Sequence, residues 1–203
     1  MMRRTLTYLG CLLFVLRIAA QQKQVRVVEQ DITNRIALYA VNENEQDLDV
    51  KITISGTDFR QSRAKPRFIR VPAASKVHLK TIVLIRGKVP KYSYKLEVND
   101  SLSNRALKRE YEPIKIKPEK PIVLYLPPNC QNCDSLIVAM NNSKYLYNSY
   151  DLAEMPKIKD QLQTAFGADT PIDSLSTPIL NVGGKLYSQI ENLEQILEAL
   201  NKE

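Results

Sequence analysis

The sequence predicts an α+β chain of two domains, an all-β sandwich over residues 21–118 and a βαβαββα domain over residues 119–203. The first part alternates apolar and polar residues with period two, whereas from residue 119 strand and helix patterns follow one another. A length of 203 residues accommodates two small domains. With 44% apolar and 25% charged residues, the composition is that of a globular chain and excludes a disordered tail, a collagen and a coiled coil.

Residues 1–20 have the pattern of a secretory signal peptide. Two arginines precede a largely apolar run over residues 9–20, which ends in two alanines and is followed by polar residues. The run is short for a membrane span and is interrupted by Arg17, so cleavage and export are favoured over a retained anchor. Cys11 lies in a segment similar to a lipoprotein cleavage box, but the apolar stretch before it is short, and we expect it to leave with the signal. The expected location is periplasmic or extracellular, with an uncleaved N-terminal anchor as the alternative.

The first domain is predicted to contain six or seven strands and no helix. The expected strands cover residues 25–27, 36–40, 48–54, 77–80, 83–85 and 92–98. Turn-rich pieces at 42–47, 72–75 and 99–101 separate them. Short strands with frequent turns are typical of an antiparallel β-sandwich, and this one resembles an immunoglobulin-like domain in size.

The second domain is predicted to run strand, helix, strand, helix, strand, strand, helix. The expected elements are a buried strand at 121–126, a helix with Cys133 and Met140 on one face, a strand near 145–147, a helix at 156–166, strands at 179–182 and 186–188, and a helix with an apolar stripe from Leu193 to Leu200. Proline at the start and glycine just after the end delimit the second helix. A Gly-Gly turn joins the last two strands.

The formal net charge of +7 is divided unevenly along the chain. Residues 21–118 carry 20 Lys and Arg against 11 Asp and Glu, whereas residues 119–203 carry 6 against 11. A basic cluster accounts for much of the excess: Arg60, Arg63, Lys65, Arg67 and Arg70. A solvated strand face and loop is the favoured interpretation of this cluster, and contact with an anionic envelope component or with the acidic second domain is the alternative. Export and the lack of a nucleic-acid-binding motif argue against nucleic acid.

After the signal, two cysteines remain, Cys130 and Cys133, and they form a Cys-x-x-Cys motif. The motif follows a buried strand and occupies the first turn of a predicted helix. The N-terminus of a helix carries a partial positive charge and free N–H groups, which stabilise a thiolate, the species that attacks disulfides. We therefore expect Cys130 to be the nucleophile and Cys133, one turn further on, to resolve the mixed disulfide.

A second feature lies near the end of the predicted domain. Thr177 and Pro178 directly precede a predicted strand. A bond before proline at such a position can be cis, which exposes the backbone of Thr177 for pairing with an extended substrate.

From residue 119 to residue 203 the chain resembles a glutaredoxin-like member of the thioredoxin superfamily. The motifs that carry the resemblance are Cys130-Gln131-Asn132-Cys133 after the first strand and Thr177-Pro178 before the hairpin. The resemblance implies that Cys130 attacks, that Cys133 resolves, and that Pro178 is cis and lines a substrate groove with Thr177. Asn129 occupies the place of the tryptophan that precedes the first cysteine in thioredoxins.

Two departures from the family pattern concern glutathione. Glutaredoxins usually have Thr-Val-Pro before the hairpin and a Gly-Gly after it that helps to hold glutathione. This chain has Ser176-Thr177-Pro178 and Ser188-Gln189 at these places. Glutathione is therefore a doubtful partner, and no resident cofactor is expected.

The leading interpretation is an exported thiol–disulfide oxidoreductase that acts on protein thiols and disulfides. The competing interpretation is a non-catalytic envelope-binding protein in which Cys130 and Cys133 form a structural disulfide, or an inactive remnant of a redox site. A metal site is not expected, because zinc usually takes four ligands and only the two cysteines and His78 remain. His78 alternates with Val77 and Leu79, so its side chain is expected to face solvent.

Overall fold

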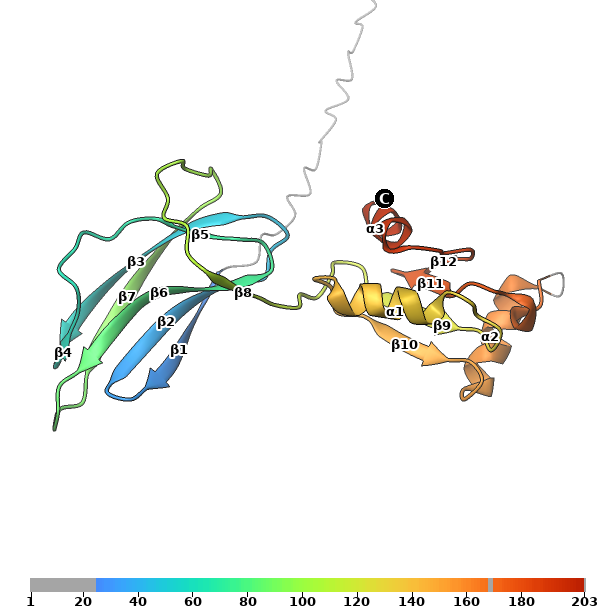
Figure 1. Cartoon of the computed structure of the whole chain (residues 1–203), viewed down its shortest axis with the longest axis horizontal. Helices are drawn as coiled ribbons and strands as arrows, with labels where there is room; N and C mark the ends of the chain where they lie inside the picture. Colours follow the sequence, from blue (N-terminus) through green and yellow to red (C-terminus); the bar gives the residue numbers. More distant parts are fainter. Residues whose placement is uncertain (1–24, 168–169, 203) are drawn as a thin grey trace, which may run out of the picture.

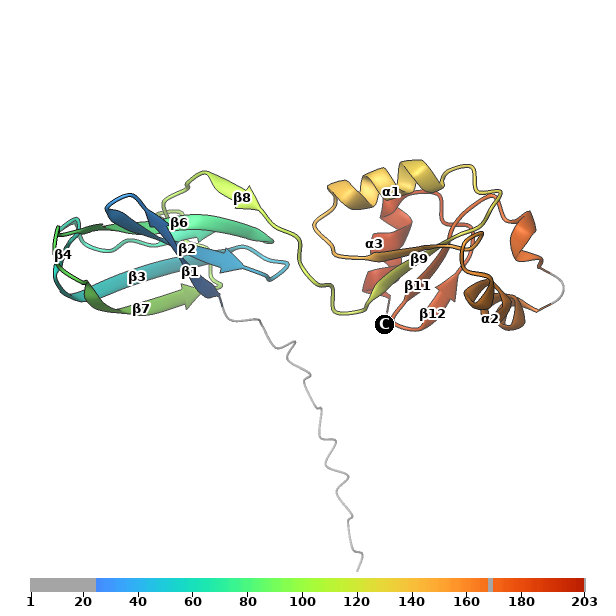
Figure 2. The same ribbon diagram turned by 90° about the horizontal axis from the view of Figure 1, so that it is seen from below.

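The computed structural model describes residues 25–167 and 170–202, so the expected signal peptide lies outside the described residues. The fold is mixed α+β, mostly β-sheet with three α-helices in the described part, which confirms the predicted class at this level. Figures 1 and 2 show two units side by side, joined by the segment that follows β8. None of the helices in the described ranges is both long and apolar enough to cross a membrane.

The first unit consists of two antiparallel sheets. Its strands are β1 (Arg26–Ile32), β2 (Arg35–Asn42), β3 (Leu48–Thr57), β4 (Phe59–Arg60), β5 (Ile69–Val71), β6 (Ser75–Leu84), β7 (Lys91–Asn99) and β8 (Tyr111–Pro113). One sheet has the order β1-β2-β6-β4, with β8 also paired to β6, and the other has the order β5-β3-β7. All of these pairs are antiparallel.

One apolar core fills the space between the two sheets. In β3, Val50, Ile52 and Ile54 are buried and alternate with residues that are more exposed. Leu38 and Ala40 of β2 enter the same core from the opposite sheet. Burial of a side chain such as leucine or isoleucine contributes roughly 1.5–3 kcal/mol, so this alternation stabilises the pairing of the sheets. The period-two prediction is confirmed for β3, whereas in β2 the buried residues follow one another over residues 36–38 and 40–42.

Strand β6 differs from the expectation of two separate strands at 77–80 and 83–85. It is continuous from Ser75 to Leu84. Its pairing with β2 is irregular between Leu38 and Tyr39, so Leu79 has no direct partner, and the buried positions pass from Leu79 to Ile82. The slip of one residue breaks the period-two pattern without ending the strand. The short strands β4, β5 and β8 were not expected, because two or three residues carry no period.

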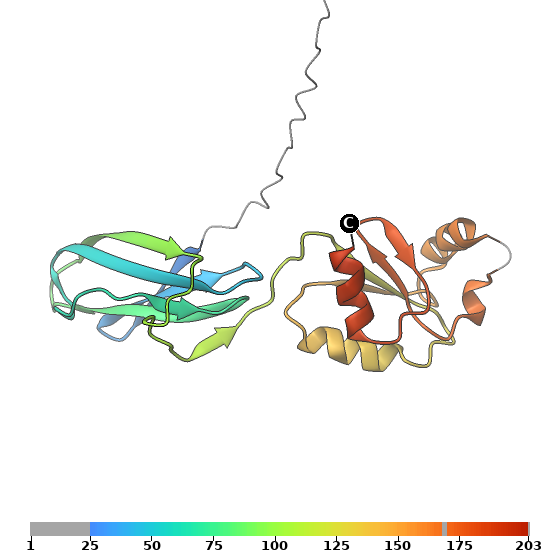
Figure 3. The same cartoon turned by 90° about the horizontal axis from the view of Figure 1, so that it is seen from above.

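The second unit contains one four-stranded sheet and three α-helices. Its elements are β9 (Ile122–Leu126), α1 (Cys133–Asn142), β10 (Asn148–Asp151), α2 (Pro156–Phe166), the 3₁₀ turn η1 (Ile172–Ser174), β11 (Ile179–Val182), β12 (Lys185–Tyr187) and α3 (Leu193–Asn201). The strand order is β10-β9-β11-β12, with β10 parallel to β9 and the other pairs antiparallel. β9 is an inner strand of this sheet, which positions the cysteine turn at its end (Figure 2). Figure 3 shows α1, in yellow, and α3, in red, next to each other beside the sheet.

Helices cover both faces of this sheet. Ile122 and Leu124 of β9 pack with buried residues of α1 and α3. Tyr125 points to the other face, where it joins a smaller cluster with Leu162 of α2. Because β9 is covered on both faces, its sequence is a continuous apolar run rather than an alternation of apolar and polar residues.

Two local expectations for this unit have different outcomes. Gly183 and Gly184 have φ of +57° and +92°, the conformation of a tight two-residue hairpin turn, as predicted. The strand expected near 145–147 instead runs over Asn148–Asp151. Tyr145 makes only an isolated bridge, to Ile116. β10 is a mostly exposed edge strand, so its polar sequence lacks the apolar alternation from which a strand is predicted.

The segment between β8 and β9 contacts both units. The Ile114 N–H donates to the carbonyl of Ala74 in the first unit, at 2.9 Å. Two residues later, Ile116 is buried in the core of the second unit. The expected boundary between residues 118 and 119 therefore falls in a connector that packs against its neighbours on both sides.

Candidate functional site

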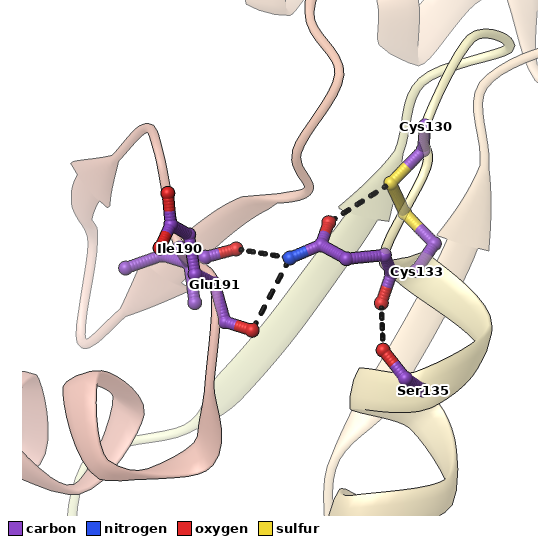
Figure 4. Close-up of a disulfide and its surroundings, with 6 residues drawn as sticks. Cys130, Cys133, Ser135, Ile190 and Glu191 are labelled. Carbon is purple, nitrogen blue, oxygen red and sulfur yellow. Dashed lines mark hydrogen bonds between the residues drawn. A yellow bond between two sulfur atoms is a disulfide. The ribbon is translucent and has the colours of Figure 1, made fainter.

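The cysteine turn lies between the central strand β9 and helix α1. The backbone N–H of Cys130 donates to the carbonyl of Pro127 at 3.1 Å and closes the turn. Cys130 and Cys133 are joined by a disulfide, with their Cα atoms 5.7 Å apart (Figure 4). Both cysteines named from the sequence therefore lie together at the end of a buried strand.

Helix α1 begins at Cys133, with Asn132 as its N-cap residue. The Asn132 side chain makes no capping hydrogen bond to the helix, so this side chain satisfies none of the free N–H groups of the first turn. The helix end carries partial positive charge close to both sulfurs. Cys130 precedes the helix by three residues rather than occupying its first turn.

The two cysteines differ in exposure. Cys133 is buried, with 7% of its surface exposed, and it faces the core side of α1 together with Leu136 and Met140. Cys130 is half-buried. A substrate thus has better access to Cys130 than to Cys133, which is the asymmetry that an attacking and a resolving cysteine require.

The segment before β11 lies against the cysteine turn. The Asn129 side chain donates through Nδ2 to the carbonyl of Asp173 at 2.8 Å, and the Gln131 N–H donates to the carbonyl of Ser176 at 2.9 Å. The predicted substrate-binding residues Asn129, Thr177 and Pro178 are therefore brought to the same end of the sheet as the cysteines.

The conformation of the segment differs from the family pattern in one respect. No peptide bond among the described residues is cis, so the bond between Thr177 and Pro178 is trans, contrary to what the resemblance implies. Thr177 is half-buried, whereas Pro178 is buried at the start of β11. Of these two residues, Thr177 is the more accessible to a substrate.

Asn132 connects the cysteine turn to the segment that leads into α3. Its Nδ2 donates to the carbonyls of Ile190 and Glu191, both at 3.2 Å (Figure 4). Its Oδ1 lies 3.7 Å from Sγ of Cys130. Since the two carbonyls accept only from the amide nitrogen, they fix the orientation of the amide, and the oxygen must face the sulfur.

This orientation has a chemical consequence once the disulfide is reduced. A thiol at Cys130 donates to Oδ1 of Asn132, whereas a thiolate meets the negative end of the amide dipole. The side chain therefore favours the thiol and opposes the helix end, which favours the thiolate. The balance of the two decides how much attacking thiolate is present at neutral pH.

The described residues contain no group of three or more His, Cys, Asp or Glu side chains that could hold a metal ion. His78 lies in the first unit, where Nε2 is 2.8 Å from Oγ1 of Thr81 and the ring packs edge-on against Tyr39. His78 is more exposed than its buried neighbours Val77 and Leu79, as the alternation predicts, but its ring is half-buried beside Arg109 rather than fully in solvent.

Sequence reasoning missed the roles of Asn132 and of the Ile190–Glu191 carbonyls. Asn132 stands inside the motif, but its position alone does not say which way its amide points. The two carbonyls come 58 and 59 residues later and carry no side-chain signal.

Comparison with protein-family models, with curated proteins and with solved structures finds no match to this chain.

Proposed function

We propose that the protein is an exported thiol–disulfide oxidoreductase that acts on protein disulfides through Cys130 and Cys133. The observation that carries this proposal is the pairing of a half-buried with a buried cysteine at the end of the central strand. The backbone around Ser176 and Thr177 lies beside them and offers a surface for an extended substrate.

The element order of the second unit supports the proposal. A strand, the Cys-x-x-Cys turn, a helix, a strand, a helix, Thr177-Pro178, a hairpin and a helix follow one another as in the glutaredoxin-like proteins that the sequence resembles. The first unit, in the proposal an immunoglobulin-like sandwich, would hold the redox unit near an envelope component or a client protein of the periplasm.

The reaction proceeds in two exchanges. The Cys130 thiolate attacks one sulfur of a substrate disulfide and forms a mixed disulfide, while the other substrate sulfur leaves as a thiolate and takes up a proton. The Cys133 thiolate then attacks Sγ of Cys130, forms the Cys130–Cys133 disulfide and releases the second substrate sulfur. Two electrons pass from the protein to the substrate, and the reverse sequence oxidises a substrate dithiol.

The Cys133→Ser variant tests this assignment. Reduced C133S, mixed with insulin as a substrate with exposed disulfides, is expected to accumulate a covalent adduct at Cys130, because the resolving thiol is missing. Intact mass spectrometry under non-reducing conditions measures the adduct. The matched Cys130→Ser variant keeps only the buried thiol and is expected to form at least tenfold less.

The competing function is a non-catalytic envelope-binding protein with a structural disulfide. A cavity with a basic rim in the first unit, described below, favours this second candidate. It predicts no adduct with C133S and no turnover of insulin disulfides by the reduced wild-type protein. Either result would overturn the oxidoreductase assignment.

Export is tested separately. The mass of the protein recovered from expressing cells is expected to correspond to a chain that starts at Gln21, after removal of residues 1–20. A mass that retains these residues would support the uncleaved anchor instead.

A further inference from the structure

A cavity of about 310 Å³ opens between the two sheets of the first unit, a size at the lower end of small-molecule sites. Its apolar floor is made by Ile52 and Ile69 from one sheet, Leu79 from the other, and Leu107 from the loop before β8. The first three are at most 4% exposed, so the floor is part of the core. The lining residues of the cavity all precede β9, so none of them belongs to the cysteine turn.

The rim of the cavity is cationic. Lys65, Arg67, Lys80 and Arg109 line it, and no Asp or Glu is among its described lining residues. None of the ion pairs formed within the described ranges includes any of these four side chains. Burial, and secondly the charge of Arg109, lowers the pKa of His78, so this ring is neutral at neutral pH and the four cations set the charge.

Two of the cations are held in place by neutral groups. Arg109 donates through Nη1 to the carbonyls of His78 and Leu79, at 2.9 and 3.1 Å. Arg67 donates through Nη2 to the carbonyl of Arg105 at 3.3 Å. Carbonyl partners orient a guanidinium without neutralising it, so the positive charge remains available to an anion.

Arg70, the fifth member of the sequence cluster, shows the contrast. Its Nε lies 2.6 Å from Oδ1 of Asp49, a carboxylate that is fully buried. This cation is compensated inside the protein and has a structural role. The cluster seen in the sequence thus divides into a neutralised arginine, the rim residues Lys65 and Arg67, and two residues, Arg60 and Arg63, that do not line the cavity.

The edge of β6 is open where the cavity lies. On that edge β4 pairs with residues 83–84 and β8 with residues 75–77, which leaves residues 78–82 without a strand partner (Figure 1). The Arg109 side chain covers the carbonyls of His78 and Leu79 there. A guanidinium on these carbonyls blocks the addition of a peptide strand but leaves the apolar floor reachable for a small ligand.

We infer that this cavity binds a small amphipathic carboxylate, an aliphatic chain that lies on Leu79 and Leu107 with its carboxylate among Lys65, Arg67, Lys80 and Arg109. The apolar floor excludes a purely polar anion as the best ligand, and the uncompensated rim excludes a neutral or cationic one. Binding also relieves the repulsion among four like charges, so the ligand stabilises the fold.

Octanoate is the probe, titrated into the full mature chain and followed by the backbone amide NMR signals. Saturable shifts are expected at Ile52, Leu79 and Thr81, together with a rise in Tm. Octan-1-ol, which has the same chain length without the charge, and acetate, which has the charge without the chain, are each expected to bind at least tenfold more weakly.

The double variant Lys65→Gln/Arg67→Gln is expected to lose about tenfold in octanoate affinity, since both side chains are exposed and their removal leaves the core intact. The matched control is Arg60→Gln/Arg63→Gln, which removes the same charge outside the cavity and is expected to retain affinity within twofold. Equal losses in both variants, equal binding of octan-1-ol, or no saturable shift would overturn the inference. Binding to anionic phospholipid vesicles without binding of octanoate would assign the rim to a membrane surface instead.

Discussion

At the residue scale, the side-chain amide of Asn132 faces the sulfur of Cys130. Its amide is held by the carbonyls of Ile190 and Glu191, so its oxygen faces Sγ at 3.7 Å. A neutral side chain can therefore oppose the helix end, through its orientation rather than through a charge. The sequence shows that the dipeptide Gln131-Asn132 is polar and uncharged, but it does not show which way the Asn132 amide points.

Substitution of Asn132 is expected to change the thiolate fraction of reduced Cys130 in a defined direction. Asn132→Ala removes the facing carbonyl oxygen, so alkylation by iodoacetamide at pH 7 should be several-fold faster. Asn132→Asp places a carboxylate beside the sulfur and should slow it. The measurement is the rate of Cys130 alkylation against pH in the reduced protein.

Asn129→Ala is the matched control, because the Asn129 side chain donates to the carbonyl of Asp173, and none of the hydrogen bonds in the described part of the chain joins it to the sulfur. Its alkylation rate should stay within twofold of wild type. If the Ala and Asp variants of Asn132 shift the rate in the same direction, altered loop packing rather than the amide dipole is responsible.

At the scale of elements, the ends of two helices depend on lysines from the connector. Neither α1 nor α3 has a basic residue in its last turn. Lys115 donates through Nζ to the carbonyls of Met140, Asn141 and Ser143 at the end of α1. Lys120 donates to the carbonyls of Leu200 and Lys202 at the end of α3. A cation there satisfies free carbonyls and the negative end of the helix dipole.

Lys115→Met keeps much of the aliphatic stem and removes the charge. The variant is expected to lower the local stability of α1 by about 1–2 kcal/mol. Hydrogen exchange followed by mass spectrometry of peptides that cover Cys133–Asn142 measures this loss as faster exchange. Lys157→Met, at an exposed position, should leave the exchange of α1 unchanged, and equal acceleration in both variants would contradict the capping role.

At the scale of the whole molecule, Tyr145 joins the two units. It is 6% exposed in the core of the second unit. Burial, and secondly the charge of and a hydrogen bond to Glu45, raises the pKa of Tyr145 to about 12. Glu45 lies in the loop between β2 and β3 of the first unit, and the apolar side of the junction includes Ala74 from the same unit.

The raised pKa predicts an alkaline loss of stability. Unfolded tyrosine releases its proton near pH 10, whereas folded Tyr145 keeps it up to about pH 12, so stability is complete below pH 10 and falls as pH rises between these values. Burial, and secondly a hydrogen bond to Glu29, likewise raises the pKa of Tyr92 to about 12, so Tyr92 contributes to the same loss of stability between pH 10 and pH 12.

Urea denaturation midpoints at pH 9 and pH 11 measure the effect. Tyr145→Phe is expected to reduce the fall in stability between these two values, because its side chain has no proton to release. Tyr111→Phe changes a side chain that is 56% exposed. The urea midpoint of this variant should fall between pH 9 and pH 11 by as much as that of the wild type. An unchanged fall in Tyr145→Phe would show that the junction does not carry the alkaline transition.

The described contacts between the two units do not include the basic cluster. The five basic residues singled out from the sequence form no ion pair with any described residue after 118. Two of them line a cavity in their own unit, and Arg70 pairs with Asp49. The junction is built instead from connector backbone and from Tyr145.

Local pattern was sufficient for much of this protein. The alternation in β3, the apolar run of β9, the limits of α2 and the Gly183–Gly184 turn were all predictable, because each depends on residues that are neighbours along the chain. The placement of Cys130 and Cys133 between a buried strand and a helix was predictable for the same reason.

Tertiary structure decided what depends on groups far apart in sequence. The amide of Asn132 is oriented by carbonyls almost sixty residues away, α1 and α3 are capped by Lys115 and Lys120, and Lys80 and Arg109 meet Lys65 and Arg67 only across a folded sandwich. The periodicity of the sequence does not predict such contacts, since a backbone carbonyl has no side-chain signal. A lysine that caps a helix also cannot be distinguished in the sequence from a lysine that faces solvent. The sequence by itself determined the positions of the reactive cysteines along the chain. The fold determined which groups lie close to them and change their reactivity.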